Sequence, residues 1–424
     1  MAIECLSIVG GGWAGLAAAV AGCEAGYEVT LYEASKTLGG RARSLAQTWD
    51  NTPLDNGQHI LIGAYSATLD LMRKVGLKPE ALLQRLPLDL RFADGQGLAL
   101  PQLAAPLNAL IGIASARGWQ VRDKWVLLKA CITWQRWGFS APTHWSVADL
   151  HSHGQLTPTV VQTLIEPLCL SALNTPMAQA SANVFLRVLH DALLGPRGSS
   201  DLLLPTADLS ALLPQACHNW LSQRGVQMHL GHRLDANDVM REVRHSDAQH
   251  HLILATPSWE AARLSAQLNP VWSAQAAALS HMAIATVYVH CADPAFRGLP
   301  RPMVALHSNA TQPAQFVFCR TRLMQQNGLL AGVVSACDMP DDMTSDQLAQ
   351  GFIHQLQQQL GLQRLQVVQT IVEKRATFAC TPTLHRPIAA IAPRVWACGD
   401  YVEGPYPATL EGAVRSGLQV IAQL

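Results

Sequence analysis

The stretch Ile8-Val9-Gly10-Gly11-Gly12-Trp13-Ala14-Gly15 is a G-x-G-x-x-G turn. It follows a short apolar segment, 3–9, that is typical of a β-strand, and it opens an alanine-rich segment, 14–25, that is typical of a helix. A second apolar segment, 27–32, predicts another strand, and the acidic Glu33 comes directly after it. A glycine turn between a strand and a helix, with an acid at the end of the next strand, indicates a dinucleotide-binding βαβ unit.

Each glycine of this turn has a separate physical task. Gly10 permits the tight turn, Gly12 lets the backbone approach a pyrophosphate, and Gly15 lets the helix pack close to the strand. The pyrophosphate is expected on the amides at the start of the helix, where the helix dipole favours negative charge. Glu33 is expected to accept hydrogen bonds from ribose hydroxyls, and a carboxylate there argues against a 2′-phosphate.

Two further segments favour FAD over NAD. Residues 38–43 read Leu-Gly-Gly-Arg-Ala-Arg, in which Arg41 and Arg43 offer charge-assisted hydrogen bonds to phosphate. Near the end of the sequence, residues 395–400 predict a buried strand that ends in Gly-Asp, and a small-residue helix follows from Glu411. An N-terminal dinucleotide fold completed by such a strand, Gly-Asp pair and helix is the layout of FAD-dependent oxidoreductases.

These motifs make the chain resemble the flavin amine oxidase and phytoene desaturase superfamily. Two blocks, Asn56-Gly57-Gln58-His59 and Leu173-Asn174-Thr175-Pro176, narrow the resemblance to the hydroxysqualene dehydroxylases, also known as squalene-associated FAD-dependent desaturases. Residues 201–205 and 399–413 also fit that subfamily, so the resemblance extends over nearly the whole chain.

The resemblance implies an α/β fold in which a Rossmann-type FAD-binding domain is interleaved with an α+β substrate domain. Residues 1–90, 201–260 and 386–424 are expected to form the FAD-binding domain. Residues 91–200 and 261–385 are expected to form the substrate-binding domain. Inside the second substrate segment, the apolar pattern predicts strands at 287–290, 316–319 and 366–373. It also predicts one long helix at 345–360.

The resemblance also carries over a set of cofactor-binding residues: Gly10, Gly12, Trp13, Ala14, Gly15, Glu33, Gly40, Arg41, Val226, Gly399 and Asp400. Val226 belongs to a short predicted strand that passes beside the adenine in the superfamily. Asp400 is expected to hydrogen-bond the ribityl or pyrophosphate region. No cysteine or histidine lies in a recognised flavin-linkage motif, so we expect noncovalent FAD.

The reaction implied by the resemblance is reductive removal of an allylic hydroxyl from a squalene precursor, in isoprenoid and hopanoid metabolism. An apolar tunnel has to bind such a substrate, and the protein has to assist the departing oxygen and exclude water. No motif identifies the acid, so four residues are candidates for catalysis, each with a structural alternative: His59, Glu166, Asp191 and Tyr406.

Composition limits the other classes of function. The 30 basic and 30 acidic residues leave a net charge of zero, so there is no electrostatic case for binding nucleic acid. Only 14% of residues are charged and 49% are hydrophobic, which indicates an apolar surface or cavity. The ten cysteines are scattered singly, without metal-ligand spacing, so we expect reduced thiols in a cytoplasmic protein and no metal site.

The window 107–145 has two possible interpretations. An apolar run at 107–114 precedes five of the eleven tryptophans, which alternate with lysine and arginine. Tryptophan next to basic residues is typical of a segment in the headgroup region of a membrane, here the inner face of the cytoplasmic membrane. Alternatively, the tryptophans line the substrate cavity.

Three other functions stay open beside the dehydroxylase hypothesis. A carotenoid or phytoene-type desaturase would use the same cofactor and a lipid substrate in the opposite redox direction. A flavin amine oxidase would place an aromatic pair near the flavin, for which Tyr401 and Tyr406 are available. A lipid-binding flavoprotein without turnover would be expected to lose the glycine turn or the Gly-Asp pair, and both are intact. The electron donor is not indicated by any motif.

Overall fold

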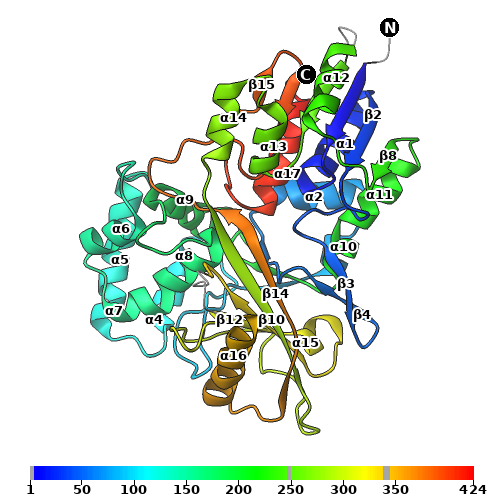
Figure 1. The fold of residues 1–424 in the computed structure, drawn as a ribbon. Helices are drawn as coiled ribbons and strands as arrows, with labels where there is room; N and C mark the ends of the chain where they lie inside the picture. The colour runs from blue at the N-terminus through cyan, green and yellow to red at the C-terminus, as the bar shows by residue number, and fades with distance from the viewer. Residues whose placement is uncertain (1–3, 246–249, 338–343) are drawn as a thin grey trace.

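The structure is a computed structural model, and it describes residues 4–245, 250–337 and 344–424. Its first layer is a six-stranded sheet with the strand order β15-β16-β9-β1-β2-β8, in which all neighbours except the pair β15 and β16 are parallel. The strands are β1 (Cys5–Val9), β2 (Glu28–Glu33), β8 (Gln227–Leu230), β9 (His250–Leu254), β15 (Ala390–Ala392) and β16 (Val395–Ala397). Segments from the beginning, the middle and the end of the chain therefore complete one sheet (Figure 1).

Two small-residue helices, α1 (Trp13–Ala25) and α17 (Leu410–Ile421), pack against each other beside this sheet. Their backbones approach so closely that a Cβ atom on Gly417 would lie 2.3 Å from the Ala14 carbonyl oxygen. Glycine and alanine at this contact thus allow the first and the last helix of the chain to pack together.

Further helices and short strands surround the six-stranded sheet. The helices are α2 (Ser66–Lys74), α3 (Pro79–Leu82), α10 (Leu209–Leu212), α11 (Pro214–Ser222), α12 (Ala236–His245), α13 (Ser258–Ser265) and α14 (Pro270–Ala277). A two-stranded ribbon, β3 (Ser44–Trp49) with β4 (Thr52–Asp55), and a three-stranded sheet, β5 (Leu61–Ile62), β7 (Leu202–Pro205) and β6 (Leu83–Leu86), lead away from it.

The second large sheet is antiparallel, with the order β11-β12-β13-β10-β14. Its strands are β10 (His281–Cys291), β11 (Met303–Ala305), β12 (Phe316–Cys319), β13 (Leu329–Val334) and β14 (Leu365–Phe378). Helix α16 (Ser345–Leu360) covers one face, where the ring of Phe352 packs on Gly332. Phe316 and Phe318 point to the opposite face, as the two-residue period of a strand requires, and they line a cavity. A short helix, α15 (Arg320–Met324), follows β12.

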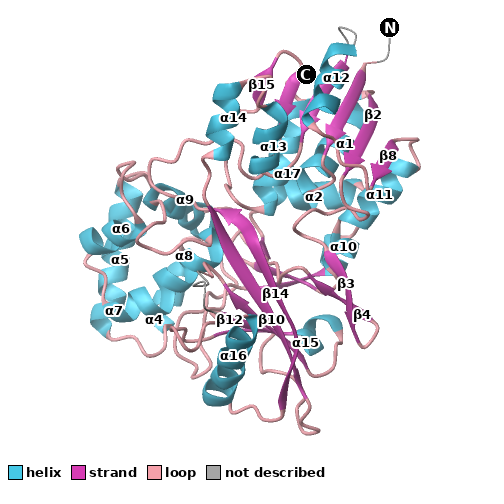
Figure 2. Ribbon diagram, viewed as in Figure 1, coloured by secondary structure: helices cyan, strands magenta, loops and turns pink. Residues whose placement is uncertain are grey.

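A helical lobe covers the cavity side of this sheet (Figure 2). It consists of α4 (Leu107–Ser115), α5 (Val121–Arg136), α6 (Val147–Gly154), α7 (Pro158–Val160), the π-helical turn η1 (Val161–Ile165), α8 (Glu166–Leu173) and α9 (Ala182–Leu193). None of the helices in the described part of the chain has the length and apolar character of a membrane span.

Candidate cofactor and substrate site

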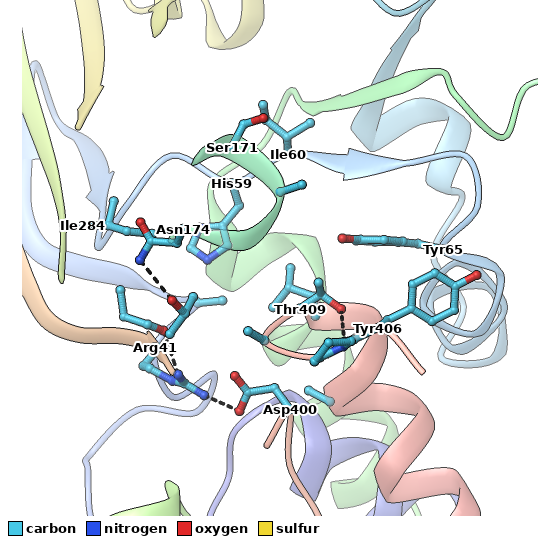
Figure 3. A pocket seen from close by; sticks show the side chains of 18 of the residues that line it. Arg41, His59, Ile60, Tyr65, Ser171, Asn174, Ile284, Asp400, Tyr406 and Thr409 are labelled. Atoms are coloured by element: carbon cyan, nitrogen blue, oxygen red, sulfur yellow. Dashed lines mark hydrogen bonds and ion pairs between the residues drawn. The ribbon is translucent and has the colours of Figure 1, made fainter. Parts of the chain in front are cut away.

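A single large cavity of about 990 Å³ connects the glycine turn to the helical lobe. One end is lined by the turn, by Glu33 and by residues 39–43. The other end is lined by apolar side chains from α4, α5, α8 and the face of the antiparallel sheet. The residues that line the cavity also include His59, Asp400 and Tyr406; Figure 3 shows the Tyr406 ring turned away from the other two and lying beside Tyr65.

The glycine turn has the close contacts that the sequence predicts. Gly10 has a φ of +114°, and a Cβ atom there would lie 2.5 Å from the Ala255 carbonyl oxygen. A Cβ atom on Gly15 would lie 1.9 Å from the Gly10 carbonyl oxygen, so helix α1 starts directly against the strand end. Gly12 differs, because a Cβ atom there would meet nothing nearer than the Cα atom of Gly40 at 3.9 Å. The space beside Gly12 is therefore an open cradle next to a helix N-terminus, which fits a pyrophosphate.

Glu33 lies at the end of β2 and lines the cavity. One carboxylate oxygen accepts a hydrogen bond from the Gly11 amide at 2.6 Å, and the other accepts one from the Ser35 amide at 2.7 Å. These two bonds hold the carboxylate at the rim of the cradle. A carboxylate has acceptor capacity beyond two bonds, so this one fits the ribose hydroxyls of a dinucleotide.

The predicted Val226 contact is not found. Val226 lies before β8, is half-buried against the hydrophobic core and does not line the cavity. Residues 232–234, just beyond the other end of β8, line it instead. The carboxyl ends of parallel strands meet at the same sheet edge as the glycine turn, so the end of β8 and not its start reaches the cofactor groove.

Arg41 and Asp400 form an ion pair at 2.6 Å (Figure 3). Arg41 also donates to the Ala376 carbonyl at 2.7 Å, so its guanidinium joins the C-terminal Gly-Asp pair to strand β14. Asp400 is buried and Gly399 donates its amide to the Ser416 hydroxyl of α17. The sequence-based expectation placed both charged groups on the cofactor without anticipating that they pair with each other.

Trp13 also has a role that its position in the motif did not indicate. Its ring is buried and its Nε1 donates to the Ala42 carbonyl at 3.0 Å. The amide of Gly39 donates to the Gly11 carbonyl at 2.8 Å, and Gly40 lies against Gly12. The second glycine segment is therefore fastened across the first, and together they form one wall of the cradle.

Among the four candidates for catalysis, His59 lies in the wall of the cavity. Its Nδ1 is 2.9 Å from the Gly57 carbonyl, which only accepts, so Nδ1 carries the proton. Burial lowers the pKa of His59 below 6.5. The imidazole is therefore neutral at pH 7, and its Nε2 is a hydrogen-bond acceptor.

Asp191 and Tyr406 lie together at the cavity wall. Burial opposes ionisation of Asp191, but hydrogen bonds from Arg187 at 2.7 Å and His190 at 2.8 Å lower its pKa below the usual value. Burial and the negative charge of Asp191 raise the pKa of Tyr406. At pH 7 this corner therefore holds a carboxylate and a protonated phenol.

The fourth candidate, Glu166, is placed elsewhere. It begins α8 after the π-helical turn, its side chain is exposed, and it does not line the cavity. The cavity is instead lined by other residues of α8, Leu168, Leu170, Ser171 and Ala172. Helix α8 turns Glu166 towards solvent, so the structure does not bring it together with the other three candidates.

Comparison with known proteins agrees with this geometry. Residues 13–423 match the family of flavin-containing amine oxidoreductases. The chain belongs to that family. The same family description, together with the glycine cradle and the Gly-Asp pair, makes the protein an FAD-dependent oxidoreductase.

Within the flavin-containing amine oxidoreductases, the chain is similar to two bacterial hydroxysqualene dehydroxylases. The enzyme of Sinorhizobium fredii is 26% identical, and the match covers 97% of this chain and 95% of that protein. The enzyme of Rhodopseudomonas palustris is 27% identical, and the match covers 97% of this chain and 96% of that protein. The zeta-carotene desaturase of Synechocystis is 33% identical over 28% of this chain and 25% of its own. In fold, the chain resembles the cyclohexylamine oxidase of Brevibacterium oxydans, with a TM-score of 0.67, 15% identity, and coverage of 100% of this chain and 94% of that one.

Sequence reasoning missed a buried polar network behind the His59 segment of this amine oxidoreductase. Arg320, with 0% of its side chain exposed, donates to Asp55 at 2.9 Å and to Gln58 at 3.2 Å. The Tyr288 hydroxyl donates to the Asp55 carbonyl at 3.0 Å. Arg320 and Asp55 are 265 residues apart in the sequence, so no local pattern indicates that they pair. The only available guide is the general rule that a buried charge requires a partner of opposite charge.

The tryptophans of the window 107–145 are divided between the interior, where one lines the cavity, and the surface, where they could meet a membrane. Trp119 and Trp134 are buried, and Trp134 lines the cavity. Trp125 and Trp137 are exposed. Trp145 is half-buried and packs edge-on against Trp137 at 5.9 Å. Helix α5 thus presents tryptophan both to the cavity and to the surface.

Proposed function

We propose that this flavin-containing amine oxidoreductase reduces hydroxysqualene to squalene, a precursor of hopanoids and sterols. The observation that carries the proposal is the single cavity, which has a dinucleotide cradle at one end and apolar walls at the other. A long hydrocarbon offers no charge to bind, so affinity has to come from burial of apolar surface. Similarity to hydroxysqualene dehydroxylases along nearly the whole chain supports the same substrate.

In the proposed reaction, the allylic C–O bond breaks, a hydride forms the new C–H bond, and a proton converts the departing hydroxide to water. Reduced FAD, noncovalently bound, would supply the hydride. Gly12, Glu33, Gly40 and Asp400 are the residues that would hold it. The apolar wall would exclude water from the electron-deficient allylic carbon.

The departing oxygen requires a hydrogen-bond donor, and the cavity corner at Tyr406 offers one. Tyr406 keeps its proton because burial and Asp191 raise the pKa of its hydroxyl. Asp191 is ionised, and the neutral His59 presents an acceptor nitrogen. We therefore assign the donor role to Tyr406, and a role in orienting Tyr406 to Asp191. The electron donor that reduces FAD is a separate, unidentified partner.

An anaerobic reaction tests the proposal. Purified yellow protein is reduced chemically, hydroxysqualene is added, and products are identified by mass spectrometry while flavin absorbance is followed. Squalene formation with stoichiometric return of the oxidised flavin spectrum is the expected result. Phytoene-like and polyamine substrates are offered to the oxidised protein in parallel. No conversion of hydroxysqualene, with bleaching of the flavin by another substrate, would contradict the dehydroxylase proposal and leave the oxidoreductase family intact.

A desaturase of the carotenoid type is the second candidate, because one segment of the chain also matches a zeta-carotene desaturase. That match covers a much smaller share of the chain than the dehydroxylases do. For an amine oxidase, the expected aromatic pair is not formed by Tyr401 and Tyr406, because Tyr401 does not line the cavity. Tyr65 lines it beside Tyr406, but the two rings meet at 75°.

We also propose a division of the chain into domains and a location in the cell. We assign residues 1–90, 201–260 and 386–424 to the FAD-binding domain, and 91–200 and 261–385 to the substrate-binding domain. The protein would act in the cytoplasm, at the inner face of the membrane, where its apolar substrate is dissolved. Contact with that membrane would be made through residues 107–145.

A further inference from the structure

The exposed apolar side chains are concentrated on one part of the surface. Of the thirteen large apolar side chains that the described residues expose, eight lie between residues 103 and 137. They are Leu103, Leu107, Leu110, Ile111, Val121, Trp125, Ile132 and Trp137. A monomeric protein rarely exposes such a concentration of apolar side chains unless the surface meets a partner or a lipid.

The exposed face of α5 alternates apolar and basic residues. Val121, Trp125 and Ile132 are exposed at the spacing of one helix face, and Arg122, Lys129 and Arg136 are exposed beside them. Val121 is 84% exposed and Trp125 is 68% exposed. The acid of this helix, Asp123, is buried and accepts a hydrogen bond from the Gln120 amide. The surface of α5 is therefore both apolar and positively charged.

The opposite faces of the same two helices line the cavity. Ala109 and Ile113 of α4, and Leu127, Cys131 and Trp134 of α5, are all cavity residues. Both helices belong to the lobe that Figure 1 places away from the six-stranded sheet. The α4–α5 pair thus separates the apolar end of the cavity from the exposed apolar and basic surface by the thickness of one helix layer.

We infer that the α4–α5 pair docks on an anionic lipid bilayer and passes the apolar substrate from the bilayer into the cavity. The interleaved lysine and arginine side chains fit acidic headgroups, and the tryptophan and aliphatic side chains fit the boundary between headgroups and acyl chains. A second copy of the chain fits less well, because a two-fold interface would place each basic stripe against its own like charges. The docking specifies the membrane contact proposed above for residues 107–145, and its test does not depend on the reaction; the identity of the transferred substrate rests on the proposed function.

Vesicle sedimentation tests the docking. FAD-loaded full-length protein is mixed with vesicles of phosphatidylcholine, with or without phosphatidylglycerol. We expect stronger binding to the phosphatidylglycerol vesicles, weakened by salt. The double variant Trp125→Ser/Ile132→Ser should bind about tenfold more weakly. Arg122→Glu/Lys129→Glu should lose about tenfold or more of its binding to the anionic vesicles, down to the level of the neutral ones.

Two matched variants serve as controls. Val271→Ser removes an apolar side chain that is 80% exposed on α14, and Arg297→Glu reverses an exposed charge outside the lobe. Both should bind vesicles like the unmodified protein. Absence of binding by the unmodified protein, or an equal loss in the controls, would overturn the inference. So would a dimer in analytical ultracentrifugation that Trp125→Ser dissociates.

Insertion and transfer need separate measurements. Lipids brominated in the acyl chains should quench part of the tryptophan fluorescence, and Trp125→Phe should bind vesicles normally while losing that part. With hydroxysqualene, Trp125→Ser/Ile132→Ser should react slowly when the substrate is in vesicles and normally when it is in detergent micelles. Equal rates from vesicles for this variant and the unmodified protein would refute the transfer step. If neither preparation is converted by any form, the proposed reaction fails and the vesicle-binding result still stands.

Discussion

At the scale of single residues, two glycines of the same turn differ in what surrounds them. A Cβ atom on Gly15 would overlap the Gly10 carbonyl oxygen at 1.9 Å, whereas a Cβ atom on Gly12 would project into the open cradle. Gly15→Ala should therefore lower the free energy of unfolding by about 1–3 kcal/mol, because the helix has to move. Gly12→Ala should fold normally and retain less FAD. Chemical denaturation and flavin absorbance per protein measure the two effects, and equal destabilisation by both variants would contradict this distinction.

Tyr406 and Tyr401 form a second matched pair. Tyr406 lines the cavity, whereas Tyr401 does not, and the buried hydroxyl of Tyr401 has no hydrogen-bond partner among the described residues. Tyr406→Phe should lower kcat by about 100-fold or more with normal FAD content, because a proton donor to the leaving oxygen is lost. Tyr401→Phe should leave kcat near that of the unmodified protein. A normal kcat for Tyr406→Phe would show that Tyr406 is not the proton donor.

His59 should make stability depend on pH in a predictable direction. Burial lowers its pKa below 6.5, so the folded protein binds a proton at this site less readily than the unfolded chain does. The resulting stabilisation is present above pH 6.5 and is lost as the pH falls through the folded pKa, by at most about 1.4 kcal/mol per pH unit. His59→Gln should flatten the fall in unfolding free energy below pH 6.5. His354→Gln, at an exposed position on α16, is the control and should keep the slope of the unmodified protein.

At the scale of elements, the buried pair of Arg320 and Asp55 joins α15 to the segment that carries His59. The two side chains are 0% and 2% exposed, and Asp55 also accepts the Leu209 amide at 2.9 Å. Arg320→Met should cost about 3–5 kcal/mol of unfolding free energy, because it leaves the carboxylate buried without its cation. Adding Asp55→Asn should recover a large part of that loss. Additive losses in the double variant would show that the two charges act independently.

Elements whose residues carry a local signal were predictable from the sequence. The predicted strand at 316–319 and the predicted helix at 345–360 coincide with β12 and α16, because a short continuous apolar run and a helix capped by Thr344 are encoded locally. The π-helical turn before α8 has no comparable signal, and Glu166, which follows it, faces solvent and does not line the cavity. For α5, the sequence showed tryptophans beside basic residues but not which face each one takes.

At the scale of the whole molecule, the close backbone contacts around the glycine turn could be predicted from the sequence, because they depend on a few glycines. The apolar end is assembled from helices and strands that are remote in sequence, such as α4, α8 and β12. Each of their apolar residues could equally have belonged to the hydrophobic core. Composition alone therefore indicated a hydrophobic interior, but it did not indicate which residues line the cavity. The Arg41–Asp400 pair, which joins two distant segments beside the cradle, was hidden for the same reason.

The two ends of the cavity should therefore respond separately to substitution. Leu168 of α8 is a half-buried residue of the apolar end, far along the chain from the glycine turn. Leu168→Trp should fill the substrate space and lower kcat/KM for hydroxysqualene by about tenfold or more, while the FAD content stays that of the unmodified protein. Leu168→Met, which keeps the volume, should retain both. Parallel loss of FAD in Leu168→Trp would mean that the cavity behaves as one unit, in which substrate walls and cofactor cradle cannot be changed independently.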